Sequence, residues 1–154
     1  MQQPYLLPSE DRLRHWKDFR ATLDANFTDE ECLLEVINYW NQYPTDIRYI
    51  VPYTPEEWPT PWELIHDNEY CRSSLAYMMA QTLLMANDNR WSNDRLRLKY
   101  INDSEFGDDF IMLIVDNKYV LNYDINKIIN FDIIKKMCII RHEYTIYEGV
   151  YTIV

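Results

Sequence analysis

Residues 58–86 read WPTPWELIHDNEYCRSSLAYMMAQTLLMA, and this stretch decides the fold. Its second half is apolar on nearly every side, which predicts a buried central helix over residues 70–86. Cys71 stands at the expected N-terminus of that helix. The positive end of a helix dipole favours a thiolate, so a nucleophilic cysteine would be placed at such a position.

Two capping boxes surround the start of this stretch. Residues 54–57 (TPEE) and 60–63 (TPWE) each combine a threonine cap, a proline at the first helical position and a closing glutamate. We expect each box to open a short helix, with Trp58 and Trp62 packed over the central helix. Stacking of these tryptophans on a carbohydrate is the alternative, and core packing is the simpler interpretation.

The chain before these boxes predicts an arm and two helices. Residues 1–8, MQQPYLLP, have two prolines and no helical period, so we expect an extended arm that frays or docks on a neighbour. A capping box at residues 28–31 opens a helix in which Cys32 is expected to be a core side chain. The helix between them follows from an apolar stripe: Leu13, Trp16, Phe19 and Leu23.

Beyond residue 87 the apolar period changes from helical to extended. A short helix or irregular stretch is expected at 125–136. Five stretches predict strands by alternation or by continuous apolar runs: 95–100, 110–115, 119–123, 137–146 and 150–154. The predicted fold class is therefore α+β: N-terminal helices, including a central buried helix, packed on a C-terminal antiparallel sheet in one domain over 9–154.

The composition excludes several kinds of site. The chain has 154 residues, of which 47% are hydrophobic, enough for one folded domain with a real core. The chain has only two glycines, so it contains neither the glycine-rich fingerprint of a dinucleotide-binding site nor a P-loop. The net charge of −10 disfavours direct nucleic-acid binding, because phosphate contacts need a basic face. It leaves acidic mimicry of DNA as an alternative.

The three cysteines, Cys32, Cys71 and Cys138, are widely separated. None forms a pair or a cysteine–histidine cluster with metal-ligand spacing, so we expect no metal and no cofactor. The odd count and the lack of a signal peptide predict a reducing compartment. No apolar run reaches the length needed to cross a bilayer, so contact with membranes is not expected.

Residues 54–124 resemble the transglutaminase-like branch of the papain-like cysteine enzymes. Cys71 with the following RSSLA matches the start of the family's central helix, and residues 110–124 look like its strand–turn–strand. In that family a histidine at the head of a strand and an aspartate near the end of the next strand complete the triad. The resemblance implies Cys71 as nucleophile and Asp124 as the acid.

The family's histidine is missing from its expected place. Residues 108–110 read DDF, and Arg72 follows the cysteine where the family has a glycine. Without an imidazole the thiol has no general base in this motif. His142, oriented by Glu148, is the candidate to replace the missing histidine. The order Cys71, His142, Glu148 along the chain is that of papain, in which the cysteine comes first, then the histidine, then a third group. The resemblance therefore predicts a degenerate form of the triad.

The composition, poor in Gly and Ala and rich in Asn, Ile, Tyr and Asp, is similar to that of small proteins of T4-like tailed bacteriophages. We expect a non-catalytic protein-binding or assembly component, with other protein subunits, including phage structural proteins, as partners. Its expected location is the virion or the host cytoplasm. Two alternatives stay open: a cysteine-dependent acyltransferase or amidase using Cys71 with Asp124 and His142, and an acidic inhibitor of a DNA-binding host protein.

Overall fold

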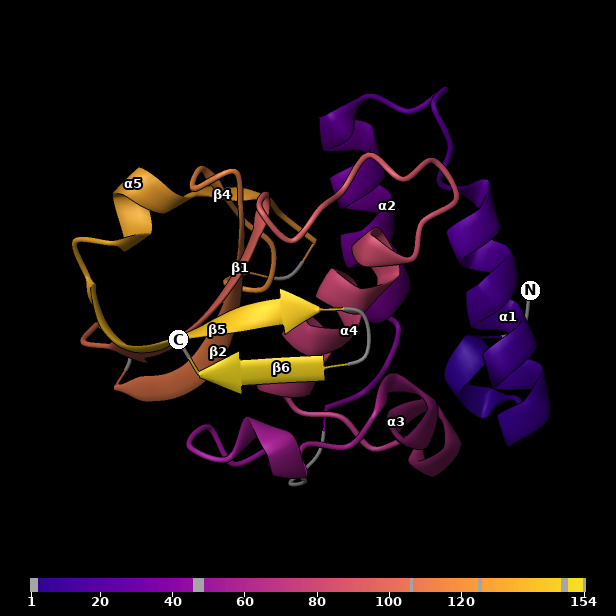
Figure 1. Ribbon diagram of the computed structural model, residues 1–154, viewed down its shortest axis with the longest axis horizontal. Helices are drawn as coiled ribbons and strands as arrows, with labels where there is room; N and C mark the ends of the chain where they lie inside the picture. Colours follow the sequence, from indigo (N-terminus) through magenta and orange to yellow (C-terminus); the bar gives the residue numbers. More distant parts are fainter. Residues whose placement is uncertain (1–2, 46–48, 106, 125, 148–149, 154) are drawn as a thin grey trace.

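The computed structural model describes residues 3–45, 49–105, 107–124, 126–147 and 150–153. Figure 1 shows helices gathered on one side of a sheet and a short helix, α5, on the other. The helices are α1 (Ser9–Thr22), α2 (Asp29–Trp40), α3 (Pro61–Asp67), α4 (Arg72–Leu84) and α5 (Phe131–Ile134), with 3-10 turns at Pro4–Leu6 and Pro55–Glu57.

The sheet has six strands in the order β4-β3-β2-β1-β5-β6, and every neighbouring pair is antiparallel. The predicted α+β class is confirmed. The strands are β1 (Leu96–Asp103), β2 (Asp108–Val115), β3 (Tyr119–Val120), β4 (Ile129–Asn130), β5 (Cys138–Tyr147) and β6 (Val150–Ile153).

Helix α4 is the buried centre of the helical layer, as predicted. Its residues from Ser74 to Leu83 are buried, and it packs between α2 and β2. Thr82 anchors it, because the indole N–H groups of Trp16 and Trp40 both donate to the Thr82 hydroxyl at 2.9 Å. That hydroxyl in turn donates to the carbonyl of Met78 at 2.6 Å. One buried side chain thus joins α1, α2 and α4 with its hydrogen bonds satisfied.

Strand β2 is covered on both faces, which explains its continuous apolar run. Ile111, Leu113 and Val115 belong to the core shared with the helices. The alternate positions, Phe110, Met112 and Ile114, pack with Phe131 and Ile134 of α5 on the opposite face. Odd-numbered β2 positions therefore face the helical layer.

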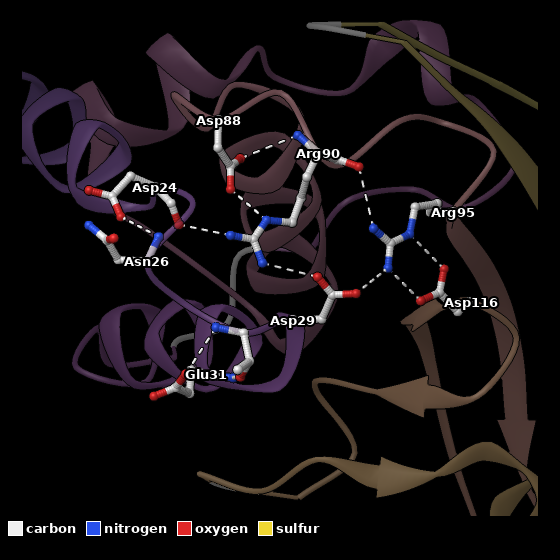
Figure 2. A network of polar contacts seen from close by, with 9 residues as sticks. Asp24, Asn26, Asp29, Glu31, Asp88, Arg90, Arg95 and Asp116 are labelled. Atoms are coloured by element: carbon white, nitrogen blue, oxygen red, sulfur yellow. Dashed lines mark hydrogen bonds and ion pairs between the residues drawn. The ribbon is translucent and has the colours of Figure 1, made fainter.

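A network of arginines and aspartates closes the end of the molecule beyond the C-terminus of α4 (Figure 2). Asp29, at the start of α2, pairs with Arg90 at 3.0 Å and with Arg95 at 2.8 Å. Arg90 also pairs with Asp88, and Arg95 with Asp116 in the β2–β3 turn. The network ties α2 to the connection between α4 and β1 and to the β2–β3 turn.

The structure replaces the predicted extended arm by a docked segment. Pro4–Leu6 form a 3-10 turn with Pro4 buried, while residues 1–2 lie outside the described residues. The buried guanidinium of Arg12 donates to the carbonyl of Leu7 and to the carbonyls of the last α3 turn. Residues 3–8 therefore pack on their own chain.

One of the two predicted capping boxes is wrong. Thr60 and Glu63 exchange both hydrogen bonds of a capping box and open α3. Thr54 makes no side-chain cap, and the following residues form a single 3-10 turn. The expected packing of two tryptophans over the central helix is also half wrong. Trp58 is buried against Tyr77 of α4, whereas Trp62 is 51% exposed and packs on α1.

Candidate functional site

Cys71 is the N-cap of α4, as the sequence predicted. Its sulfur accepts a hydrogen bond from the backbone N–H of Ser74 at 3.4 Å, and its own N–H donates to the Ser74 hydroxyl at 2.8 Å. Cysteine and serine here make the reciprocal bonds of a capping box. The residue is 7% exposed. The thiol is therefore placed at the helix dipole and is also engaged in closing the first turn.

Asp109 occupies the place where the family's histidine was expected. It lies at the head of β2, on the face that meets the helices, and two residues later the N–H of Ile111 donates to Ser73 in the first turn of α4. The Asp109 carboxylate accepts hydrogen bonds from the Tyr100 hydroxyl and from the Asn102 side chain. Burial raises the pKa of Tyr100, and the nearby Asp109 raises it further, so this hydroxyl keeps its proton and donates.

Arg72 fills the corner between α4, the head of β2 and the segment after β3. Its guanidinium stacks on the Phe110 ring at 3.6 Å and pairs with Asp108 at 3.3 Å. It also donates to the carbonyls of Asn122 at 3.0 Å and Tyr123 at 2.5 Å. The residue in the place of the family's glycine thus ties the helix start to two other elements.

Asn122 is the buried polar residue that the sequence reasoning missed. Its Oδ1 accepts from the Leu113 N–H at 3.0 Å, and its Nδ2 donates to the Ile111 carbonyl at 2.9 Å and the Arg72 carbonyl at 3.3 Å. The side chain replaces strand pairing beside β2 after β3 has ended. An amide following the apolar residues 120–121 within a predicted strand was the signal that could have identified it.

Asp124 and His142, the other two candidate catalytic residues, lie beside other side chains. Asp124 is exposed and lies 3.8 Å from Lys127. His142 lies on β5 opposite Tyr100, with its ring stacked on Tyr100 and against the edge of Tyr53.

Glu148, the predicted orienter of His142, is outside the described residues. The other imidazoles bond elsewhere, His15 to Tyr39 and His66 to Asp67. Within the described part of the chain, no imidazole is hydrogen-bonded to Cys71, so the three predicted site residues are not assembled as a hydrogen-bonded triad.

A cavity of about 410 Å³ adjoins this end of α4. It combines an apolar floor with amide, hydroxyl, guanidinium and carboxylate groups at its wall. Cys71 is not among its described lining residues. The lining residues are Asn41, Thr45, Arg72, Leu75, Met79, Asn122, Tyr123 and Asp124.

The other two cysteines, Cys32 and Cys138, have thiols of raised pKa. Burial raises the pKa of the Cys32 thiol, and burial followed by the charge of Asp103 raises the pKa of Cys138. Among the described residues, no three His, Cys, Asp or Glu side chains are grouped as metal ligands. No helix in the same part of the chain has the length and apolar character to cross a bilayer.

Neither a protein-family profile nor a curated protein matches this chain by sequence. Solved structures of LapG from Legionella pneumophila do match. The calcium-bound form has a TM-score of 0.72 at 18% identity, covering 92% of this chain and 78% of that one. A second LapG structure has a TM-score of 0.71 at 17% identity, covering 88% and 73%.

LapG has a transglutaminase-like cysteine protease fold. At this level of identity the likeness concerns the fold alone. It gives no support for a phage origin or for loss of catalysis, both of which stay predictions. This chain therefore shares the fold of LapG, in agreement with the fold that the resemblance of residues 54–124 implied.

Proposed function

We propose that this chain is a protein-binding or assembly element built on a transglutaminase-like scaffold and does not use Cys71 as a nucleophile. One observation carries the proposal: the head of β2, where the resemblance placed a histidine, holds Asp108, which pairs with Arg72, and Asp109, whose carboxylate is bonded to Tyr100 and Asn102. Acyl transfer by a thiol needs a group that takes its proton and later protonates the leaving group. No imidazole is bonded to this thiol within the described residues.

The surroundings of Cys71 support the same proposal. The sulfur caps α4, and Arg72 occupies the corner beside it through ionic, stacking and backbone contacts. These contacts give each residue near the helix start a role in the fold. The partners we expect are other protein subunits, with phage structural proteins as the sequence-based prediction.

A cysteine-dependent amidase or acyltransferase is the second candidate. The fold likeness to LapG and the position of Cys71 at the N-terminus of α4 favour it. The acidic-mimic hypothesis has less support, because the carboxylates of Asp29, Asp88 and Asp116 are paired with arginines (Figure 2).

An activity assay separates the first two candidates. The purified chain and its Cys71→Ser variant are compared for ammonia release from a glutamine peptide and for incorporation of dansylcadaverine into casein. We expect the two proteins to give the same background. Turnover by the wild type that the variant loses would establish the enzyme and reject the proposal.

Binding is tested directly with the immobilised chain against virion proteins. We expect it to capture a subunit at a fixed stoichiometry, equally well with Cys71→Ser. A chain that stays monomeric in sedimentation and captures no subunit would remove the main support for an assembly role.

A further inference from the structure

A groove of about 390 Å³ runs along α1 where α3 crosses it, and it is separate from the Cys71 region. We call it the α1–α3 groove. Its walls combine two indoles with an aliphatic side chain, and three cations stand along it. The lining residues are Leu13, Arg14, Trp16, Lys17, Arg20 and Trp62.

Trp62 is the exposed wall of the groove. It is 51% exposed and packs edge-on against Trp16 at 5.5 Å. Its helix is held by other residues: the Thr60–Glu63 capping box opens α3, and Leu64 and Ile65 are buried. The fold therefore does not require a large aromatic side chain at this position. Exposed tryptophan beside arginine is the composition that dominates binding energy at protein interfaces.

The charge of the groove is opposite to that of the whole chain. The chain carries −10, yet Arg14, Lys17 and Arg20 line this one groove. The Arg20 guanidinium lies over the Trp16 ring at 4.1 Å, and Arg14 pairs with Asp11 at 3.1 Å. Positive groups around an apolar floor match a partner that presents carboxylates around an apolar side chain.

We propose that the α1–α3 groove docks an acidic segment of a partner protein, with an aromatic or large aliphatic side chain inserted between Trp62 and Leu13. The proposal rests on the proposed protein-binding function and specifies its surface. A short segment fits better than a nucleic acid, because a polyphosphate needs many cationic contacts and meets the long-range repulsion of a chain of charge −10.

The test selects a yeast-displayed library of random dodecapeptides against the whole chain. We expect the enriched peptides to carry acidic residues around an aromatic or large aliphatic one. Trp62→Ala should weaken their binding roughly thirtyfold, the loss at which an interface residue counts as a hot spot. Lys17→Glu should weaken it by a smaller factor that shrinks as salt is added.

Two control variants isolate the groove. Tyr49→Ala removes another exposed aromatic side chain, and Lys127→Glu reverses a cation far from the groove. Both should bind the selected peptides as the wild type does. Urea denaturation of Trp62→Ala verifies that the variant is folded, and Lys17→Glu changes an exposed side chain that the fold does not need.

Several results would overturn the proposal. The first is a selection that enriches no peptide over a bare surface. The second is a set of enriched peptides without acidic residues, and the third is peptide binding that Trp62→Ala does not weaken. Trp62-dependent binding of an oligothymidylate would assign the groove to nucleic acid, and Trp62-dependent dimers in sedimentation would assign it to a second copy. Peptides that bind elsewhere would reject the groove while leaving the protein-binding function intact, whereas Cys71-dependent turnover would reject that function alone.

Discussion

The two ends of α4 differ in how their polar groups are used. At the C-terminal end, Thr82 joins two tryptophans inside an apolar core, and the residues that follow enter the arginine–aspartate network. At the N-terminal end, Cys71, Arg72 and Asn122 make polar contacts in the region where the sequence resemblance predicted a catalytic triad. The difference indicates that one end of α4 is held by a buried hydroxyl inside the core, while the other end is held by polar contacts to the head of β2 and to the segment after β3.

The largest effect is expected at the C-terminal end, from Thr82→Val. The change keeps the side-chain volume but leaves the buried indole N–H groups of Trp16 and Trp40 without an acceptor. We expect a loss of about 2–5 kcal/mol in the free energy of unfolding, measured in urea. Thr82→Ser retains the hydroxyl and should lose much less. Equal stability of the valine variant would show that the hydroxyl does not anchor the core.

Asn122→Leu tests whether the N-terminal end is now structural. It removes the amide that bonds the Leu113 N–H and the carbonyls of Ile111 and Arg72, so these buried groups lose their partner. We expect a loss of about 2–3 kcal/mol in unfolding free energy. Asn41→Ala, which removes a surface amide bond, is the matched control and should cost under about 0.5 kcal/mol. A neutral Asn122→Leu would contradict a structural role.

The arginine–aspartate network predicts a dependence of stability on pH. The Arg95 hydrogen bond, and then that of Arg90, holds the pKa of Asp29 below its usual value of 3.8. A carboxyl with a lowered pKa stabilises the fold fully above its unfolded value and loses that contribution as pH falls through the folded value.

Asp29→Asn should therefore cost about 1 kcal/mol at neutral pH, a small value because the side chain is 48% exposed. The gap between wild type and variant should close as the pH falls below 4. Urea curves at neutral and acidic pH measure it. A gap that stays constant with pH would show that the carboxylate charge is not the cause.

The smallest change in stability is expected from Cys71→Ser. Serine is a better N-cap than most residues and can accept the same N–H from Ser74. The unfolding free energy should stay within about 0.5 kcal/mol of the wild type. A loss of several kcal/mol would show that the sulfur is packed more tightly than its role as a cap implies.

The central helix and the buried strand β2 were predictable because α4 is apolar on nearly every side and β2 is a continuous apolar run. The two TPxE boxes were not distinguishable by pattern. The box at residues 60–63 is followed by Leu64 and Ile65, whose burial in the core stabilises the helix. The box at 54–57 is followed by Trp58 and a proline, and the residue before a proline is disfavoured in a helix.

The candidate site was predictable in part. The position of Cys71 and the lack of histidine at the head of β2 were local features of the sequence. The role of Asn122 was not, because it depends on β3 ending after two residues and leaving β2 to pair with a side chain. Trp62 was assigned to the wrong neighbour, since a helical period fixes which face is apolar but not which helix covers it.

The reactivity of Cys71 tests the central claim most directly. Iodoacetamide labelling at pH 7 is followed by peptide mass spectrometry, which separates Cys71 from Cys32 and Cys138, in the native and the urea-unfolded chain. The thiol that caps α4 and is 7% exposed should label more slowly in the native protein. Labelling of Cys71 that is faster in the native protein than in the unfolded chain would reveal an activated nucleophile and contradict the account.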